Sequence, residues 1–485
     1  MACRSEPALG HWRPPLNVSD VLRLDAAQLA DAYGQGHLDP CEVTEVMLNA
    51  AEAAGQRYNA MTCLNPDDAR QAASASAARW RAGTPLGLLD GVPITFKDSF
   101  NIAGLPRWHG SAVNTGMVSN ADAAPVRRAR EAGMPIIGKT SMPDYGLLMS
   151  GLSSHSGVIR NPWDCSQNTA GSSAGAAACL AAGVAPLALG TDMVGSVRLP
   201  AAVCGLVAIH ATQGRVAYDP PGNYRGAGPM ARSVADAAAL LSVVGQYDAA
   251  DHFALPGAFS HDARRLDQLR GLRIGVLSRL GHGTPVDSAT ATAVQQQAAL
   301  LGELGAEVIL LDDFDLSAED YQAVYHVMVH KGLAELYAQP AERRARVLPQ
   351  IGTMLDAALL QTALEMDQVH RRIAQAVARL ERQLAPFDYL LSPALPVRGF
   401  PCDAISPSPA LGAMSHMGFA CWFNQMGRPA GTVPVHQPGD GGCPVSVQIA
   451  GRRFDDSGVL QLMALLECQR GFAIVYPTIT LEARS

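Results

Sequence analysis

Some segments of this chain are short runs of apolar residues, and others have apolar residues spaced as on one face of a helix. This pattern predicts strands separated by helices. Short apolar runs at 92–97, 134–139 and 186–190 predict buried strands, and the first of these ends at Lys97. Amphipathic spacing predicts helices in these segments: 19–64 (two helices), 67–82, 123–132 and 174–182. The first 200 residues therefore predict an α/β arrangement.

The second half of the chain continues this alternation with longer helices. A strand at 272–277, a helix at 287–304 and a strand at 308–311 form the pattern of a β-α-β unit on a parallel sheet. Residues 315–384 have a predominantly helical pattern. Residues 445–449 alternate between apolar and polar, which predicts an edge strand.

Composition narrows the class of protein. The chain has 485 residues, of which 48% are hydrophobic and 17% charged, and its net charge is −7. This balance is typical of a globular enzyme, and the scattered arginines disfavour a nucleic-acid surface. No apolar run has the length of a membrane span. No repeat or low-complexity linker divides the sequence, so we expect one domain over 1–485.

The N-terminus and the cysteines bear on the cellular compartment. The opening sequence MACRSEPALGHWRPP carries charges and prolines where a signal peptide has an apolar core. Ten cysteines are dispersed without a C-x-x-C pair, which favours reduced thiols over a disulfide framework or a zinc site. His326 and His330 share a helix face, but no third ligand follows nearby. We expect a cytoplasmic monomer or homodimer that uses no metal and no cofactor.

The chemistry concentrates in residues 168–202, NTAGSSAGAAACLAAGVAPLALGTDMVGSVRLPAA, a stretch almost devoid of bulky side chains. Small residues let a backbone turn sharply and approach a ligand or another backbone closely. Ser172 and Ser196 both lie in glycine-flanked loops of this stretch. We expect these two hydroxyls to converge, with free N–H groups of the predicted helix at 174–182 directed at them.

A serine hydroxyl needs a base, and Lys97 is the candidate. The apolar strand in front of Lys97 would carry its ammonium group into the interior. Burial lowers the pKa of a lysine because it disfavours the charged form, and a neutral lysine is a general base. A lysine at an arbitrary position is more commonly a solvated surface charge. The apolar run favours the buried alternative here.

Three motifs, GVPITFKD, GSSAGA and GTDMVGSVRLPAAVCGL, resemble the amidase signature family in content and in spacing. The resemblance extends to PMARSVADAA at 229–238 and PVSVQIAGRRFDD at 444–456. It implies an α/β fold in one large domain, with a twisted mixed β-sheet covered by helices on both faces. It also implies that 1–82 is an N-terminal helical cover and that 315–384 is a variable helical region that sets specificity. The implied activity is hydrolysis of the C–N bond of a small-molecule amide, with carbamates (urethanes) and esters within reach of the same chemistry.

The resemblance also implies a Ser-cisSer-Lys triad. It falls on Ser196 as the nucleophile, Ser172 as the bridging serine and Lys97 as the base, with a cis peptide between Gly171 and Ser172. Neutral Lys97 would accept a proton from Ser172, which would accept one from Ser196. Ser196 would then attack a carbonyl carbon and form an acyl-enzyme.

Further residues follow from the same resemblance. The backbone N–H groups of the implied oxyanion hole belong to Met193, Val194, Gly195 and Ser196. Val194 stands where the family usually has glycine, so we expect Gly195 and Ser196 to be the better donors. The residues expected to hold the two serine loops together are Gly171, Ser173, Asp192 and Arg198.

Loops beside the serines supply candidates for substrate contact. The resemblance places the loop at 143–155 beside the scissile carbonyl, and His155 in it is expected to be a polar wall rather than a base. The residues expected to line the pocket are Met149, Ser150 and Gly151. An apolar acyl side is expected from Met149, Leu152, Met193, Tyr218 and Trp422.

Other interpretations stay open. Residues 171–175 also match G-x-S-x-G, which would make Ser173 the nucleophile of an α/β-hydrolase, although the polar segment 160–169 before it lacks the buried strand of that motif. A glutamine-hydrolysing A-type subunit of a tRNA-dependent amidotransferase shares the signature but works in a complex. A non-catalytic interaction protein that keeps the fold is the third possibility.

Overall fold

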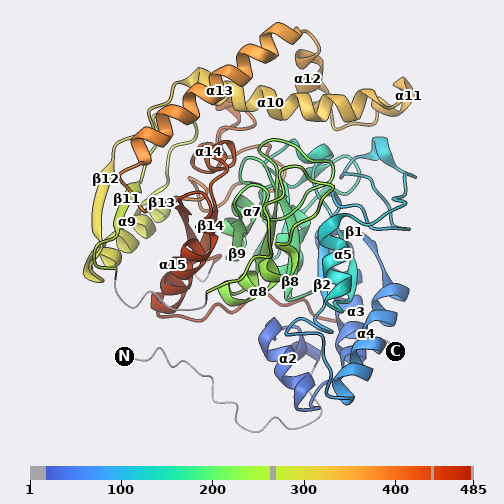
Figure 1. The fold of residues 1–485 in the computed structure, drawn as a ribbon. Coiled ribbons are helices and arrows are strands. Elements are labelled where there is room, and N and C mark those ends of the chain that lie inside the picture. Colours follow the sequence, from blue (N-terminus) through green and yellow to red (C-terminus); the bar gives the residue numbers. More distant parts are fainter. Residues whose placement is uncertain (1–17, 263–268, 438–441, 482–485) are drawn as a thin grey trace.

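The computed structural model of the chain describes residues 18–262, 269–437 and 442–481. Its centre is a mixed sheet of eleven strands (Figure 1). The strands follow the spatial order β1 (Met61–Leu64), β3 (Ile136–Thr140), β2 (Ile94–Lys97), β8 (Leu187–Asp192), β10 (Gly226–Ala231), β9 (Val207–His210), β14 (Ala430–His436), β15 (Val445–Gly451), β13 (Tyr389–Pro393), β11 (Arg273–Leu277) and β12 (Glu307–Leu311). Two small hairpins pair β4 (Leu152–Ser153) with β5 (Gly157–Val158), and β6 (Arg160–Asn161) with β7 (Asp164–Asn168).

Helices cover both faces of this sheet, as the resemblance implied. They are α1 (Val18–Val21), α2 (Ala26–Gly34), α3 (Pro40–Tyr58), α4 (Pro66–Arg81), α5 (Ala124–Glu131), α6 (Ala174–Ala181), α7 (Arg198–Val203), α8 (Val234–Val244), α9 (Ser288–Glu303), α10 (Ala318–Tyr337), α11 (Ala341–Arg344), α12 (Pro349–Ala358), α13 (Ala363–Leu384), α14 (Gly418–Met426) and α15 (Asp456–Gln469). Three short 3₁₀ turns are η1 (Ala112–Asn114), η2 (Asp144–Gly146) and η3 (Pro409–Leu411).

The sheet separates two apolar cores. On β8, Leu187 and Leu189 enter one core, while Ala188 between them enters the other. Strands buried on both sides need apolar residues at consecutive positions, which is why the sequence shows short continuous apolar runs. The mixed α/β fold predicted from the sequence is therefore confirmed.

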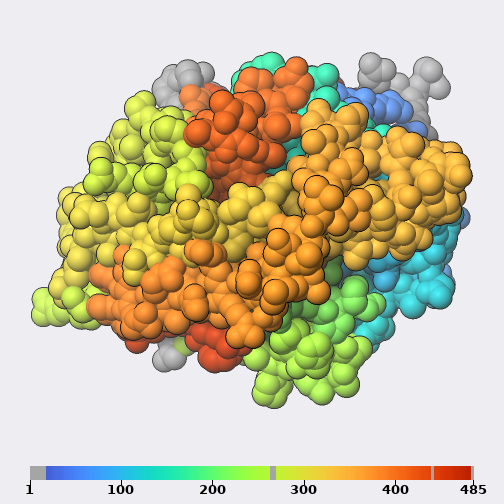
Figure 2. Space-filling model, turned by 90° about the horizontal axis from the view of Figure 1, so that it is seen from above, coloured from blue at the N-terminus to red at the C-terminus, as the bar shows by residue number. Residues whose placement is uncertain are grey.

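The helices α10 to α13 form an outer layer. Figure 1 shows them across the top of the molecule, and Figure 2, seen from above, shows their residues spread over that face. In α13 the buried residues Ile373, Ala376, Leu380 and Leu384 lie three or four positions apart, so one stripe of the helix faces inward. This layer lies over α14 and supplies one wall of the cavity described below.

Two strand predictions were wrong. Residues 445–449 form an interior strand, since β15 pairs with both β14 and β13. Its polar residue Gln448 is buried and hydrogen-bonded to Arg198 and Ser392, so the alternation does not mark a solvent-facing side. Within 19–64, where only helices were expected, Met61–Leu64 forms β1 at the edge of the sheet.

Eight cysteines of the described residues are free thiols: Cys41, Cys63, Cys165, Cys179, Cys204, Cys402, Cys421 and Cys443. Cys468 is disulfide-bonded, which corrects the expectation of reduced thiols at that position. Spacing along the chain does not tell which thiols meet in space. The N-terminal sequence weighed for a signal peptide lies outside the described residues. Among the described helices, none combines the length and apolarity needed to cross a bilayer.

The glycines of two helices provide a test of the packing around the serine loops. A β-carbon at Gly175 in α6 would lie 2.4 Å from the Ala60 carbonyl oxygen, whereas one at Gly352 in α12 would meet only Val347, at 3.5 Å. We expect Gly175→Ala to lower the free energy of unfolding by about 1–3 kcal/mol through overpacking. Gly352→Ala should raise it by about 0.5–1 kcal/mol, because alanine favours the helix. Urea unfolding measures both, and equal effects would refute the close packing at Gly175.

Candidate active site

Lys97 is the last residue of β2, which runs parallel to both β3 and β8. The carboxyl ends of parallel strands meet at one edge of a sheet and form a crevice there. Because Phe96 pairs with Leu189, the end of β2 lies beside Thr191 near the end of β8. Strand pairing therefore brings Lys97 to a site built by residues about 75 to 100 positions further along the chain.

The Lys97 ammonium group meets hydroxyls in this crevice. Its Nζ lies 2.8 Å from Ser172 Oγ and 2.9 Å from Thr191 Oγ1, and the side chain is fully buried. Burial, aided by the positive charge of Arg225 and opposed by the Asp192 carboxylate, lowers the pKa of Lys97 to about 7. A substantial fraction of the amine is therefore neutral near pH 7.

A second lysine shows why the partners matter. Lys139 on β3 is also fully buried, but its Nζ lies 2.9 Å from Asp98 Oδ1 and also donates to the Pro106 carbonyl. Asp98 in turn accepts a hydrogen bond from the Gly110 N–H at 2.9 Å. Lys139 is thus an ion-pair residue that anchors a loop, whereas Lys97 faces hydroxyl groups.

Ser172 lies in a tightly packed turn. The peptide bond between Gly171 and Ser172 is cis, as the resemblance implied. A β-carbon at Gly171 would lie 2.6 Å from the Leu148 carbonyl oxygen, so only glycine fits there. The next residue, Ser173, donates its N–H to the Ser196 carbonyl at 3.0 Å. That hydrogen bond joins the two serine loops directly.

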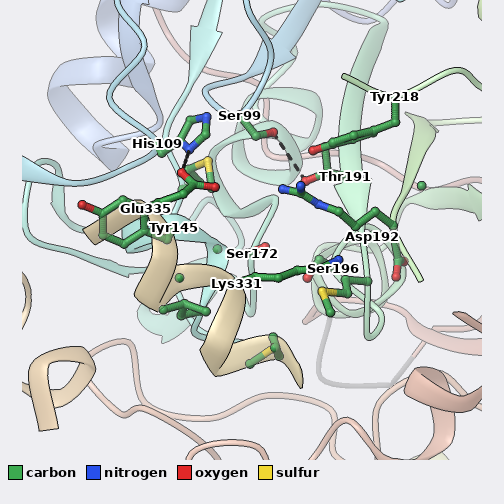
Figure 3. A pocket seen from close by; sticks show the side chains of 18 residues that line it. Ser99, His109, Tyr145, Ser172, Thr191, Asp192, Ser196, Tyr218, Lys331 and Glu335 are labelled. Atoms are coloured by element: carbon green, nitrogen blue, oxygen red, sulfur yellow. Dashed lines mark hydrogen bonds and ion pairs between the residues drawn. The ribbon is translucent and has the colours of Figure 1, made fainter. Parts of the chain in front are cut away.

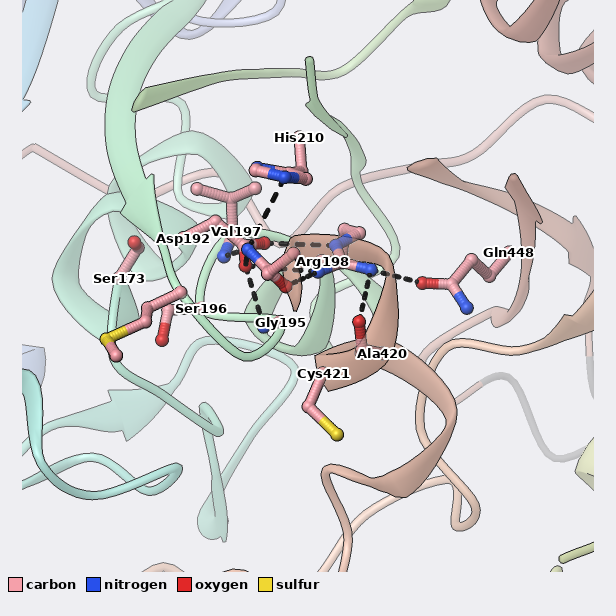
Figure 4. Close-up of polar contacts among 12 residues, drawn as sticks. Ser173, Asp192, Gly195, Ser196, Val197, Arg198, His210, Ala420, Cys421 and Gln448 are labelled. Atoms are coloured by element: carbon pink, nitrogen blue, oxygen red, sulfur yellow. Dashed lines mark hydrogen bonds and ion pairs between the residues drawn. The ribbon is translucent and has the colours of Figure 1, made fainter. Parts of the chain in front are cut away.

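A buried ion pair fixes the loop that carries Ser196 (Figure 4). Arg198 contacts both carboxylate oxygens of Asp192, at 3.0 and 3.1 Å, and Asn424 of α14 donates to Asp192 at 2.9 Å. Arg198 also donates to Gln448 of β15 at 2.7 Å. Burial alone would raise the pKa of Asp192, but Arg198 and His210 hold it well below its usual range. Asp192 therefore stays ionised.

The contacts of Asp192 change the role expected for Gly195, which was that of a donor in the oxyanion hole. Asp192 accepts hydrogen bonds from the N–H groups of Gly195, at 2.7 Å, and Val197, at 3.2 Å. The Gly195 N–H is thus committed to the loop and is not available to an oxyanion. Within the described part of the chain, no such hydrogen bond engages the N–H groups of Met193, Val194 or Ser196. Gly195 instead supplies a turn with φ of +116°, a region that favours glycine.

Ser172 and Ser196 line one cavity (Figure 3), and the Lys97 amine contacts Ser172 at 2.8 Å. The other walls carry charge, because Arg225, Lys331 and Glu335 also line this cavity. The expectation of an apolar acyl side therefore needs correction. Met193 and Tyr218 do line the cavity, but Trp422 is fully buried in the core, where its ring lies against Tyr321.

The loop expected to contact substrate lies beside this cavity rather than along its lining. Met149 Sδ lies 3.5 Å from Ser196 Oγ, and its carbonyl accepts a hydrogen bond from His416 at 2.8 Å. Ser150 packs against Gly171, and the Gly151 N–H donates to Asn168 at 2.9 Å. None of the three expected residues, Met149, Ser150 and Gly151, lines the cavity. The described contacts support a role in holding the serine turn.

A sequence profile of the amidase family matches residues 42–460. The chain belongs to the amidase family. Among solved structures, a bacterial aryl acylamidase of the amidase signature enzyme family superposes with a TM-score of 0.83 and 26% identity, covering 92% of this chain and 96% of that one. The peptide amidase of Stenotrophomonas maltophilia gives a TM-score of 0.81 and 27% identity, with 95% and 99% covered. This amidase-family chain is thus an amidase signature enzyme of the class that hydrolyses amides.

Sequence relatives of this family member carry two kinds of name. The protein AmiB2 of Mycobacterium tuberculosis, which bears the name of an amidase, is 33% identical over 96% of this chain and 100% of its own length. The A-type subunit of the glutamyl-tRNA(Gln) amidotransferase of Acidothermus cellulolyticus is 33% identical over 93% of this chain and 95% of its own. Identity alone does not separate these two.

Several residues of this amidase site were missed from the sequence. Thr191 shares the Lys97 amine with Ser172, and Arg225 and Lys331 enter the cavity from a loop and from α10. One signal was available, since the chain has only three lysines, Lys97, Lys139 and Lys331. Because the other positively charged side chains of this sequence are arginines, each lysine is a candidate for a specific role.

The histidines considered for other roles have protein partners. His155 lies edge-on to Trp108, with ring centroids 4.4 Å apart, and is not part of the cavity lining. His326 and His330 both contact the Gln361 side-chain amide, at 2.7 and 2.6 Å. Among the described residues, no group of three histidine, cysteine or acidic side chains could hold a metal ion.

The Asp192–Arg198 pair predicts a large loss of stability when one partner is removed. Arg198→Met should lower the free energy of unfolding by about 3–5 kcal/mol, because it leaves a buried carboxylate without its cation. The control Arg371→Met, which breaks an exposed pair with Asp367, should change it little. Chemical denaturation of both variants provides the measurement. Similar small effects in both would contradict the assigned role of Arg198.

Proposed function

We propose that this chain hydrolyses the C–N bond of small-molecule amides, with Ser196 as the nucleophile, Ser172 as the proton relay and Lys97 as the base. The observation that carries this proposal is the 2.8 Å contact between Lys97 Nζ and Ser172 Oγ. Burial brings the pKa of this lysine to about 7, and both serines line one cavity. A neutral amine next to a hydroxyl is the arrangement that activates a serine without a histidine.

The proposed proton path starts from the contact between Lys97 Nζ and Ser172 Oγ. Neutral Lys97 accepts a proton from Ser172 Oγ, Ser172 accepts one from Ser196 Oγ, and Ser196 forms a bond to the carbonyl carbon. The proton then returns along the same path to the leaving amine as the C–N bond breaks. A water molecule then attacks the acyl carbon and gives a proton to Lys97 through Ser172. The bond between this carbon and Ser196 Oγ breaks, and the proton returns to Ser196 Oγ. Carbamates and esters present the same carbonyl and leaving-group chemistry, and we include them as further substrates.

Ser196 requires one change of side-chain orientation in this mechanism. Its Oγ donates to Met149 Sδ at 3.5 Å, and a thioether is a weak acceptor. A stronger acceptor such as Ser172 Oγ therefore competes readily once a substrate occupies the cavity. Catalytic hydrogen bonds commonly tighten only when substrate is bound.

The proposed oxyanion donors are the N–H groups of Met193, Val194 and Ser196. Gly195 is omitted because its N–H binds Asp192 at 2.7 Å. One such donor typically lowers the barrier by about 2.7–4 kcal/mol. Gly171, Ser173, Asp192 and Arg198 are proposed to position the two serine loops. The hydrogen bond from Ser173 to the Ser196 carbonyl and the Asp192–Arg198 pair support that role.

The variable helical region 315–384 is proposed to set specificity. It contributes Met328, Lys331, Gly332 and Glu335 to the cavity lining, all from α10. The helix approaches the site closely, since a β-carbon at Gly332 would lie 2.3 Å from Leu147. Substitutions on this face of α10 therefore change the cavity without touching the serines.

A second candidate function is glutamine hydrolysis within an amidotransferase, as the name of the Acidothermus cellulolyticus relative suggests. The distinguishing measurement is turnover by the isolated chain. Hydrolysis of anilides or primary amides without partner subunits favours an independent amidase. Turnover of glutamine alone, and only after addition of partner subunits, would favour the amidotransferase.

Covalent labelling tests the nucleophile. We expect a fluorophosphonate probe to label the wild-type protein at Ser196 and to fail on Ser196→Ala, because only an activated hydroxyl reacts. The control Ser173→Ala should retain labelling, which also separates the alternative G-x-S-x-G interpretation. Peptide mapping by mass spectrometry identifies the modified residue. Labelling at Ser173 in the wild-type protein would overturn the assignment.

The pH dependence tests the base. Because the neutral amine is the reactive form and the pKa of Lys97 is about 7, kcat/KM should fall about tenfold per pH unit below pH 6 and level off above pH 8. Lys97→Arg should lose activity at every pH, since arginine stays protonated. An acid limb near pH 4 would instead point to a carboxylate base.

A further inference from the structure

Two positively charged side chains lie beside each other in the cavity that holds the serines. Arg225 directly precedes β10, where Gly226 pairs with Asp192, so Arg225 lies beside the start of the Ser196 loop. Lys331 extends from α10 into the cavity, toward Ser196 in Figure 3. A β-carbon at Gly222 would lie 3.3 Å from Arg225 Cδ and 3.7 Å from Lys331 Nζ. The two cations are therefore neighbours.

Neither cation has an ion-pair partner among the described residues. Lys331 Nζ donates to the Asn223 carbonyl at 2.9 Å, and the Arg225 guanidinium lies 4.9 Å from the centre of the Tyr218 ring. Glu335 also lines the cavity, but its carboxylate contacts His109 Nδ1 at 2.7 Å. The carboxylate of Asp192, as shown above, is held by Arg198. Glu335 therefore acts on Arg225 and Lys331 only through space, and no described carboxylate forms an ion pair with either cation.

Two like charges in a half-buried site repel each other, and an anion between them relieves this repulsion. Burial, aided by the charge of Arg225 and opposed by that of Glu335, lowers the pKa of Lys331 to about 7. An entering carboxylate would favour the protonated amine. A guanidinium is suited to bind a carboxylate through two parallel hydrogen bonds.

The choice of lysine at position 331 supports a specific role. The chain has three lysines: Lys97 contacts Ser172, Lys139 pairs with Asp98, and Lys331 is the third. All other basic residues except histidine are arginines. Lys331 thus stands apart from the chain's exposed basic residues, and it faces the cavity of the two serines.

We propose that Arg225 and Lys331 bind a carboxylate of the substrate, so that the preferred substrates are amides that carry a carboxylate a few bonds from the scissile carbonyl. This inference rests on the proposed function, because the same cavity must hold the reacting carbonyl beside Ser196. The carboxylate can belong to the acyl part or to the amine part of the amide. The experiment distinguishes these two sources.

Matched substrate pairs test the proposal. For the acyl side, N-(4-nitrophenyl)glutaramate is compared with its isostere in which a carboxamide replaces the carboxylate. For the amine side, N-butyryl-4-aminobenzoate is compared with N-butyryl-4-aminobenzamide. We expect the wild-type protein to favour the acid over its isostere in one pair by about tenfold or more in kcat/KM. Equal kcat/KM values within both pairs would overturn the proposal.

Variants locate the preference. Arg225→Gln and Lys331→Gln should each reduce the ratio of acid to isostere toward one, mainly by raising KM for the acid. The control Arg279→Gln removes an exposed cation that pairs with Asp312 and should leave the ratio unchanged. A wild-type preference that survives both cavity variants would overturn the assignment to these residues.

A binding assay separates this proposal from the proposed function. Glutarate should protect Ser196 from the fluorophosphonate at lower concentration than glutaramide does, whether or not the chosen amides are turned over. Equal protection would refute the carboxylate site while leaving the nucleophile intact. Absence of labelling at Ser196 would instead refute the proposed function, and the carboxylate site with it.

Discussion

The burial of one amine without a carboxylate partner is the constraint on which the site depends. Lys97 ends a central strand, where solvent is excluded and its hydrogen-bond partners are the hydroxyls of Ser172 and Thr191. Desolvation then lowers the pKa of the amine, and the opposing effect of the Asp192 carboxylate does not cancel this shift. Lys139, equally buried on the neighbouring strand, faces Asp98 and serves as a structural cation. The difference between these lysines lies in their partners, not in their depth.

In the loop beside Lys97, the buried charged group is in the opposite situation, because it has charged and hydrogen-bonding partners. Asp192 is fully compensated, by Arg198 and by N–H groups of its own loop, and this network reaches Asn424 and Gln448 from the last part of the chain. Buried ion pairs are costly unless every polar group has a partner, so the network tolerates few alternative geometries. The shape of the Ser196 loop is therefore set by segments more than 220 residues away. The Lys97 amine, which forms no ion pair with a described residue, thus lies near the Asp192 carboxylate, which is paired with Arg198.

In the function that we propose, the catalytic residues and the substrate-binding residues of the cavity come from different parts of the fold. Residues of the central sheet and its loops supply Lys97, Ser172 and Ser196, whereas α10 in the outer helical layer supplies Lys331 and Glu335. Such a division allows the outer layer to vary in sequence while the geometry around the serines stays fixed. In the mechanism that we propose, Arg225 connects the two parts, because its charge acts on both Lys97 and Lys331.

The sequence by itself determined the strand that ends at Lys97, the two serine loops and the α/β order of elements, because these depend on local apolar runs and on small residues that only a tight turn requires. The tertiary structure alone decided that β15 is interior, that the Gly195 N–H belongs to Asp192 and that Arg225 meets Lys331. Gln448 of β15 meets Arg198 from a remote segment, as Arg225 meets Lys331, whereas the Gly195 N–H finds its acceptor within its own loop. Local pattern shows whether a residue is polar, but only the folded chain shows what satisfies it.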